Sequence, residues 1–420
     1  MTVGVVSLGC AKNAADLEVR VGRLLSKGWT LASDSERCDT LVVNTCAFIA
    51  SARDEAEREI RRALSLKRRG RVGRVVVAGC YPERYPDRAV LFPGVDAWEG
   101  VPKKFDCQRV PGLRFSGKAF AYLKIAEGCA HRCSYCAIPS IRGPYRSRPM
   151  RAILKDARDL VRTGVKELNV IAQDPMLYGV DLGGTDIVTL LKTLDRLRGD
   201  FKVRVLYSYP SEITDGFLEW MRTSPRALRY VDVPLQHTDP AILKAMSRGS
   251  AVKATLAAAE RIRAAVPGVT LRTTVMTGFP GETAASFARL LADVKRMEFD
   301  HLGVFVYSPE KGTAAAKMKG RPSMKVAESR ALKIMAAQAR IWKRKAAGLV
   351  GKTFRALVVA PGVARLESQA PDVDGVVRLS GACAGGLVGS FAAVRITGVL
   401  GHDLSGELAE DGDRKERRRK

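Results

Sequence analysis

The chain has 420 residues, of which 46% are hydrophobic and 27% are charged. This length exceeds what one hydrophobic core usually supports, so we expect two or three domains in a globular protein. No apolar run reaches the roughly 18 residues that a membrane-spanning helix needs, and residues 1–8 lack the basic start and cleavage site of a signal peptide. We therefore expect a cytoplasmic protein with no membrane partner.

The chain is strongly basic and rich in cysteine. Its 70 Lys and Arg residues against 44 Asp and Glu give a net charge of +26, which favours contact with nucleic acid or a nucleoprotein surface. An arginine-rich proteome is the alternative explanation. Nine cysteines in a protein of a reducing compartment more often bind metal or do redox work than form disulfides.

Residues 1–115 show strands that alternate with helices, which is typical of βαβ units and a parallel sheet. The predicted strands cover 3–8, 40–44 and 75–78, and the predicted helices cover 17–27 and 54–66. A cysteine follows each strand: Cys10, Cys46 and Cys80. Because the carboxyl ends of parallel strands share one edge, we expect these thiols to converge as a three-ligand cluster site. Three unrelated buried thiols are the alternative.

A linker at 112–118 and a strand at 121–125 lead to three crowded thiols in the stretch Glu-Gly-Cys-Ala-His-Arg-Cys-Ser-Tyr-Cys. These are Cys129, Cys133 and Cys136, in a C-x₃-C-x₂-C pattern with no fourth cysteine close behind. A structural zinc site is closed by four protein ligands, whereas an iron–sulfur cubane can be held at three corners with one iron open. The spacing favours the cubane, and a zinc knuckle with His131 as fourth ligand is the alternative.

The strand-then-helix rhythm continues through the predicted central domain, residues 116–348. Strands are predicted at 121–125, 167–172, 202–207, 230–234, 270–277 and 301–307, and amphipathic helices at 152–163, 187–197, 213–223, 252–265 and 283–297. Six strands with crossover helices predict an open, partial (β/α) barrel whose chemistry lies at the carboxyl ends of the strands. A helix at 325–348 ends the domain.

Beyond residue 351 the pattern changes to short strands at 353–359, 375–379 and 391–399, separated by Gly, Pro and Asp. This predicts a small antiparallel barrel over 349–406, followed by a charged tail at 407–420. The predicted fold class is thus α/β, with a parallel-sheet domain, a partial barrel and a C-terminal β-barrel. Few aromatic residues for base stacking lie in this last barrel, which favours a protein over an RNA target.

Over nearly its whole length the chain resembles the radical S-adenosylmethionine (SAM) methylthiotransferases. These carry an N-terminal methylthiotransferase domain, a radical SAM barrel and a C-terminal TRAM domain. Three stretches are similar to the ribosomal-protein branch of the family, RimO: Ser7-Leu8-Gly9-Cys10-Ala11-Lys12-Asn13, Glu127-Gly128-Cys129-Ala130-His131-Arg132-Cys133 and Ile138-Pro139-Ser140-Ile141-Arg142-Gly143. Ala11, where Pro is usual, and Pro175, where Thr is usual, depart from the pattern without touching a cysteine.

The resemblance implies two [4Fe–4S] clusters and SAM as cofactors. One cluster, on Cys129, Cys133 and Cys136, would cleave SAM; the second, on Cys10, Cys46 and Cys80, would hold the sulfur to be transferred. A low-potential electron donor and a sulfur donor are implied as partners. The implied substrate is the β-carbon of an aspartate in small-subunit ribosomal protein S-twelve, with ribosomal RNA contact on the assembling ribosome.

Two other functions stay open on the sequence. A tRNA methylthiotransferase of the MiaB-like branch would act on a modified adenosine near the anticodon; the basic charge supports it, and His131-Arg132 and Pro139-Ser140 oppose it. A non-catalytic, metal-stabilised RNA-binding protein would fold on zinc and ignore SAM. Two sets of three cysteines oppose this second function, because closed structural zinc sites use four ligands.

Further SAM contacts are expected near the strand ends. Tyr135 is expected against the adenine, and Gly278 and Gly281 would let the backbone approach the adenosine closely. The candidates for orienting the ribose or carboxylate are Gln173, Gln236 and Arg272. Each has a structural alternative, namely loop packing for the tyrosine, an ordinary turn for the glycines, and satisfied polar groups for the other three.

Two further features carry weaker expectations. The basic helix predicted at 58–74 is expected near the N-terminal cysteine set and in contact with ribosomal RNA, with a solvated face as the alternative. Three cysteines have no partner at ligand spacing and are expected to be small buried or incidental thiols: Cys38, Cys107 and Cys383.

Overall fold

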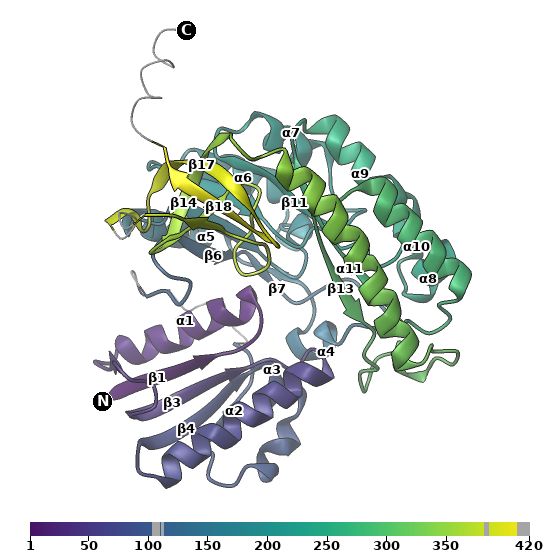
Figure 1. The fold of residues 1–420 in the computed structure, drawn as a ribbon. Helices are drawn as coiled ribbons and strands as arrows, with labels where there is room; N and C mark the ends of the chain where they lie inside the picture. The colour runs from purple at the N-terminus through teal and green to yellow at the C-terminus, as the bar shows by residue number, and fades with distance from the viewer. Residues whose placement is uncertain (103–109, 111–112, 382–385, 410–420) are drawn as a thin grey trace.

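The computed structural model describes residues 1–102, 110, 113–381 and 386–409, and it shows three domains following one another along the chain (Figure 1). Cys107, Cys383 and residues 410–420 of the predicted tail lie outside the described residues. Within the described ranges, no helix combines the length and the apolar character needed to cross a membrane.

The N-terminal domain is a five-stranded parallel sheet in the order β2-β1-β3-β4-β5. Its strands are β1 (Thr2–Ser7), β2 (Thr30–Leu31), β3 (Cys38–Thr45), β4 (Val72–Gly79) and β5 (Ala97–Glu99). The three predicted strands are confirmed. The sequence analysis missed β2 and β5 because edge strands of two and three residues carry too little pattern.

Both faces of this sheet are covered, by α1 (Ala11–Leu25) and α2 (Ala50–Arg68) (Figure 1). Side chains alternate across a strand, so Val42 packs with Leu17 of α1, whereas Leu41 and its neighbours pack with Ile60 of α2. Cys38 is buried in the second of these clusters, as predicted.

The basic helix begins and ends earlier than predicted. It ends at Arg68, so that Arg71 lies in the following turn and Arg74 on β4. Because α2 starts at the cysteine edge of the sheet and runs back antiparallel to β3, its arginine-rich end lies at the opposite edge. The prediction that this end lies near the N-terminal cysteine set is therefore wrong.

The central domain is a six-stranded parallel sheet in the order β6-β9-β10-β11-β12-β13, and it is not closed. Its strands are β6 (Phe120–Lys124), β9 (Glu167–Ile171), β10 (Lys202–Val205), β11 (Ala227–Asp232), β12 (Thr270–Thr277) and β13 (His301–Val306). The covering helices are α5 (Met150–Arg162), α6 (Ile187–Asp195), α7 (Asp215–Thr223), α9 (Val252–Ala265) and α10 (Ala284–Met297). The predicted partial barrel is confirmed.

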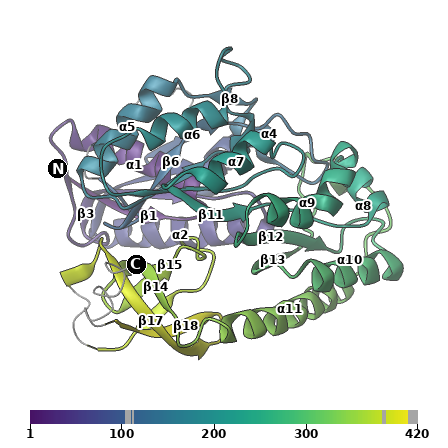
Figure 2. The same cartoon turned by 90° about the horizontal axis from the view of Figure 1, so that it is seen from above.

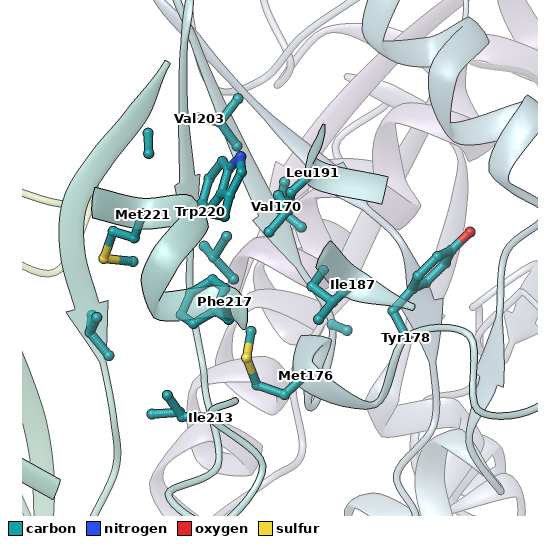
Figure 3. Packing of buried hydrophobic residues seen from close by; sticks show 14 of the residues in the cluster. Val170, Met176, Tyr178, Ile187, Leu191, Val203, Ile213, Phe217, Trp220 and Met221 are labelled. Atoms are coloured by element: carbon teal, nitrogen blue, oxygen red, sulfur yellow. The ribbon is translucent and has the colours of Figure 1, made fainter. Parts of the chain in front are cut away.

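The packing of α7 shows how the helices hold the strands in place (Figure 3). The hydroxyl of Thr214 caps the helix by accepting the N–H of Phe217 at 3.2 Å. Phe217 and Trp220, one turn apart, are buried in one cluster with Val170 of β9 and Val203 of β10. Burial of each such side chain stabilises the fold by about 1.5–3 kcal/mol. The packing of α7 therefore holds the strands that carry the site in place.

The chain then crosses the molecule on α11 (Met324–Ala347), a helix about 36 Å long, to a closed five-stranded barrel (Figure 2). The barrel order is β14-β15-β16-β18-β17, and its strands are β14 (Thr353–Ala360), β15 (Val363–Leu366), β16 (Val377–Leu379), β17 (Phe391–Leu400) and β18 (Asp403–Leu408). The sequence analysis missed β15 and β18. The barrel therefore includes 407 and 408, which were assigned to the charged tail.

The C-terminal barrel docks onto the central domain through buried polar contacts. Arg365 bonds the carboxylate of Glu167 at 2.9 Å, and Arg204 donates to the same carboxylate at 2.9 Å. Burial opposes ionisation of Glu167, but the two guanidinium groups hold its pKa below the ordinary value. From the barrel side, Asp374 accepts the hydroxyl of Tyr230 at 2.7 Å. The two domains are thus joined by buried ion pairs and a hydrogen bond.

Candidate cluster and substrate site

The C-x₃-C-x₂-C loop lies between β7 (Ala126–Glu127) and α4 (Ile138–Arg142). It begins at Gly128, where φ is +76° and a Cβ would lie 2.0 Å from the carbonyl oxygen of Pro144, so only glycine fits. In mid-loop the backbone N–H and hydroxyl of Ser134 donate to the carbonyls of Met246 and Ala245 at 3.0 and 2.8 Å. The loop is thereby tied to the end of α8 (Pro240–Ala245).

The three thiols of this loop lie close enough to influence one another. Burial is the main cause that raises the pKa of Cys129 to about 11 and that of Cys136 to about 12, and the neighbouring thiols act in the same direction. A metal that binds here must displace these protons, which soft iron–thiolate bonding does. The loop therefore suits a thiolate-ligated cluster.

The part of the chain that the structure describes has no group of three His, Cys, Asp or Glu side chains poised to hold a single metal ion. A cubane differs, because its cysteines bind separate irons and need not meet at one point. His131 does not complete a four-ligand set, since its Nε2 pairs with Asp174 at 2.6 Å and its ring stacks on Tyr209 at 3.8 Å. These contacts oppose the zinc-knuckle alternative and fit a three-cysteine cluster.

The other three cysteines converge at the carboxyl edge of the N-terminal sheet. The neighbouring strands β1, β3 and β4 deliver Cys10, Cys46 and Cys80 to this edge. The fit is tight, because a Cβ on Gly9 would lie 2.8 Å from the Cβ of Cys46. The predicted convergence is thus what the topology produces, while the ligand role itself stays a prediction.

Two asparagines brace these loops. The amide of Asn13 donates to the carbonyls of Leu8 and Thr45 at 2.7 and 3.1 Å, and Asn44 donates to the carbonyl of Asn13 at 2.9 Å. Because Asn13 lies in the first turn of α1, these bonds tie the start of this helix to the ends of β1 and β3, and the loops hold their positions relative to one another. The sequence analysis quoted Asn13 only as part of a motif and placed Asn44 only at the end of a predicted strand.

The three thiols of this edge differ in character. Burial raises the pKa of Cys80 to about 12 and also raises that of Cys46. Burial acts in the same direction on Cys10, but Lys12 and Arg142 outweigh it and lower the pKa of this thiol. Protein atoms crowd around the sulfur of Cys10, but by surface area this residue is the most exposed of the three.

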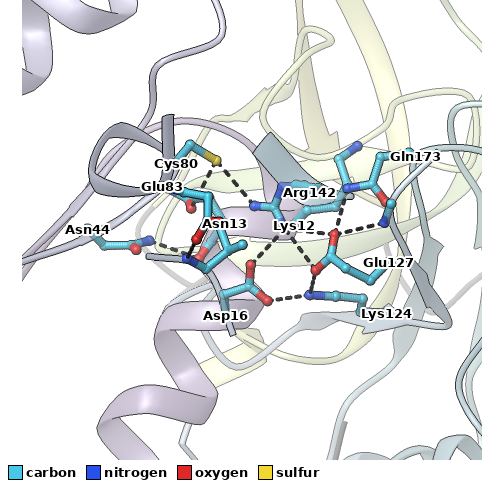
Figure 4. Close-up of polar contacts among 12 residues, drawn as sticks. Lys12, Asn13, Asp16, Asn44, Cys80, Glu83, Lys124, Glu127, Arg142 and Gln173 are labelled. Carbon is cyan, nitrogen blue, oxygen red and sulfur yellow. Dashed lines mark hydrogen bonds and ion pairs between the residues drawn. The ribbon is translucent and has the colours of Figure 1, made fainter. Parts of the chain in front are cut away.

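A buried ionic network joins the two cysteine sets (Figure 4). Arg142, from the end of the C-x₃-C-x₂-C segment, donates to Asp16 of α1 at 2.9 Å, to Glu127 at 3.0 Å and to the sulfur of Cys80 at 3.4 Å. Lys124 bonds the same two carboxylates. The sequence analysis missed this network, because nothing in one dimension shows that Asp16 meets residues more than a hundred positions away.

Three predicted SAM contacts lie near one another. Tyr135 packs edge-to-face on Phe279 with ring centroids 6.5 Å apart, and its hydroxyl accepts a hydrogen bond from Arg248 at 3.4 Å. Gly278 has φ +77°, and a Cβ there would lie 2.5 Å from the Cβ of Ala327. Close packing against Ala327 therefore explains why glycine stands at this position, without any contact to SAM. Gly281 has φ +85° and donates its N–H to the carbonyl of Gly320 at 2.9 Å.

The polar candidates have different surroundings. Gln173 donates to Glu127 at 2.9 Å and so joins the ionic network. Gln236 has φ +68° and is bonded through its backbone to β12. Arg272 lies between Asp232 at 3.9 Å and Asp374 at 4.0 Å, so protein carboxylates already match its charge. Contact of these residues with SAM stays a prediction.

Family models match all three domains. The model described as "Radical SAM superfamily" matches residues 123–294, "Uncharacterized protein family UPF0004" matches 2–100, and "TRAM domain" matches 350–409. Among solved structures, the radical SAM methyltransferase TsrM from Kitasatospora setae is 15% identical, with a TM-score of 0.54 over 75% of this chain and 76% of that chain. These findings define the class, a radical SAM fold with an added TRAM domain.

Curated relatives narrow the class further. Proteins named "Ribosomal protein uS12 methylthiotransferase RimO" from Elusimicrobium minutum and Syntrophus aciditrophicus are 39% and 40% identical. The alignments cover 96% and 98% of this chain and 98% and 99% of those proteins. The chain therefore belongs to the RimO family of radical SAM methylthiotransferases. As an enzyme of this family it uses SAM and two [4Fe–4S] clusters, which sets aside the non-catalytic alternative.

Proposed function

We propose that this enzyme replaces a hydrogen on the β-carbon of an aspartate in ribosomal protein uS12 with a methylthio group. The observation that carries the proposal is the pair of three-cysteine sets, each without a fourth protein ligand among the described residues, joined by one buried network. The full-length relatives that bear the uS12 name give the substrate. A low-potential electron donor and a sulfur donor complete the reaction as partners.

The residues divide the work between two sites. Cys129, Cys133 and Cys136 would hold the cluster that faces SAM, and Cys10, Cys46 and Cys80 would hold the cluster that faces the sulfur to be transferred. When bound, the clusters and SAM supply the electron, the radical that removes hydrogen, and the transferred sulfur and methyl groups. The protein's part is to place the two cluster sites around one substrate carbon and to hold them there.

The ionic network performs this placement. Arg142 reaches from the C-x₃-C-x₂-C segment to the sulfur of Cys80, and Asp16 and Glu127 fix its guanidinium from both sides. A hydrogen bond to a ligating sulfur also tunes the reduction potential of a cluster. One buried side chain therefore couples the geometry of both sites.

The test is anaerobic incubation of the iron–sulfur-reconstituted enzyme with SAM, sulfide and a chemical reductant, once with uS12 and once with total tRNA. Intact-mass analysis of uS12 and mass analysis of tRNA nucleosides follow. We expect a methylthio mass gain on uS12 alone, absent when SAM is omitted. A gain on a tRNA adenosine alone would overturn the proposed substrate in favour of the tRNA branch.

A further inference from the structure

Lys12 is a buried lysine that has no carboxylate within ion-pair distance among the described residues. Its side chain reaches from the N-terminal domain into the central domain, although only 9% of the residue is exposed. The Nζ atom lies 3.4 Å from the carbonyl oxygen of Ala172 and 3.4 Å from the ring centroid of Tyr207. Among the described residues, no carboxylate approaches this Nζ within the 4.0 Å of an ion pair.

This arrangement leaves part of the ammonium group unused. Lysine has three N–H donors; the carbonyl takes one, and the ring face of Tyr207 stabilises the charge by a cation–π contact. A buried charge is costly unless an anion matches it. The neighbouring Arg142 is ion-paired with two carboxylates. Lys12 instead has the sulfur of Cys10 as a negative neighbour, and Asp232 and Glu127 act on its charge only from beyond ion-pair distance. An anion from outside the chain would complete the site.

The position of Lys12 is that of a substrate contact. Ala172 and Tyr207 follow β9 and β10, so Lys12 touches the carboxyl edge of the barrel, where ligands of such folds bind. It lies among the electrostatic neighbours of both Cys10 and Cys129, and hence between the two cysteine sets. Tyr207 is held at φ +75°, which is strained for a bulky side chain and typical of functional sites.

We propose that Lys12 binds the side-chain carboxylate of the target aspartate, selecting aspartate over neutral side chains and turning its β-carbon toward the space between the cysteine sets. The inference rests on the proposed function. It differs from a role in balancing the charge of a cluster, because it makes discrimination between aspartate and asparagine in the substrate depend on this residue.

The experiment compares uS12 with a form in which the target aspartate is replaced by asparagine, an isosteric neutral side chain. Binding of each protein to reconstituted enzyme is measured without reductant, and methylthio mass gain is measured with reductant. The variants are Lys12→Met, Lys12→Arg and, as matched control, Lys155→Met on the exposed face of α5. Iron content and circular dichroism confirm that each variant is folded and loaded.

We expect wild-type enzyme and Lys155→Met to prefer the aspartate form. Lys12→Met should lose about 30-fold or more of this preference, through KM and binding, and Lys12→Arg should restore part of it. A folded, loaded Lys12→Met variant that keeps the wild-type preference would overturn the role of Lys12 and leave the proposed function standing. Wild-type product on tRNA alone would overturn both.

Discussion

Each of the two cysteine sets brings three thiols together, but the two sets differ in how far apart their cysteines lie in the sequence. Cys129, Cys133 and Cys136 lie within eight residues, and their loop is held mainly by its own turn at Gly128 and by the bonds of Ser134. The N-terminal set comes from three strand ends spread over 71 residues. One set is therefore a local structure, whereas the other exists only if the whole sheet folds.

This difference predicts which substitutions should disturb each cysteine set. The local loop needs its own turn and the bonds of Ser134 to the end of α8, so substitutions outside the loop and α8 should spare it. The dispersed set depends on the braces at Asn13 and Asn44 and on Arg142, which belongs to the other domain. We therefore expect substitutions in the network and in the sheet to affect the N-terminal set first.

The largest expected effect separates the roles of the two sets. Cys133→Ala should abolish SAM cleavage, because the cluster proposed on this cysteine would bind SAM. Cys46→Ala should spare some uncoupled cleavage while reducing methylthio product to background. Chromatography of 5′-deoxyadenosine together with the intact mass of uS12 measures both. Equal loss of cleavage in the two variants would contradict separate roles.

The next effect tests the buried network. Arg142→Gln leaves Asp16 and Glu127 without this cation, which should destabilise the cluster-free protein by about 3–5 kcal/mol. Urea unfolding measures this loss. Lost support of Cys80 should also weaken iron binding at the N-terminal set about 10–100-fold. Arg132→Gln, in the same loop but exposed, serves as control and should change neither quantity.

A smaller effect tests the sheet edge itself. Gly79 has φ +97°, and a Cβ there would lie 2.8 Å from Oδ1 of Asn44 and from the carbonyl of Thr45. Gly79→Ala should therefore cost about 1–3 kcal/mol and lower iron loading of the N-terminal set. Gly70→Ala is the matched control, since its φ is +69° but its Cβ would meet open space. A greater loss of N-terminal iron in the control would contradict the crowding argument.

The smallest expected effect is a loss of fold stability at acidic pH. Burial alone would raise the pKa of Glu127, but Lys124 and Arg142 hold it at about 2, below its ordinary value of 4.5. The network thus stabilises the fold above pH 4.5, and this contribution is lost as the pH falls toward 2. Urea midpoints of the cluster-free protein should fall over this interval. Glu127→Gln should flatten the decline, whereas Glu219→Gln on the surface should not.

Much of the fold was predictable because its patterns are local. Alternation of strands and helices identified the parallel sheets, and the spacing of Cys129, Cys133 and Cys136 identified their loop. The sequence also placed Cys10, Cys46 and Cys80 after strands, from which their convergence follows. It missed the short strands β2 and β5, as well as β15 and β18, where pairing rather than pattern makes the strand.

Tertiary structure alone decided the contacts between the domains. Residue type and spacing carry no record of which distant side chains meet, so the sequence did not show that Arg142 reaches Cys80 or that Lys12 lies over Tyr207. The arginine-rich end of α2 was misplaced for a related reason, because chain direction on the sheet sets which edge a helix end reaches. The sequence by itself predicted most of the elements and the candidate ligand residues within them. Packing of one sheet edge against another determined how those residues face each other.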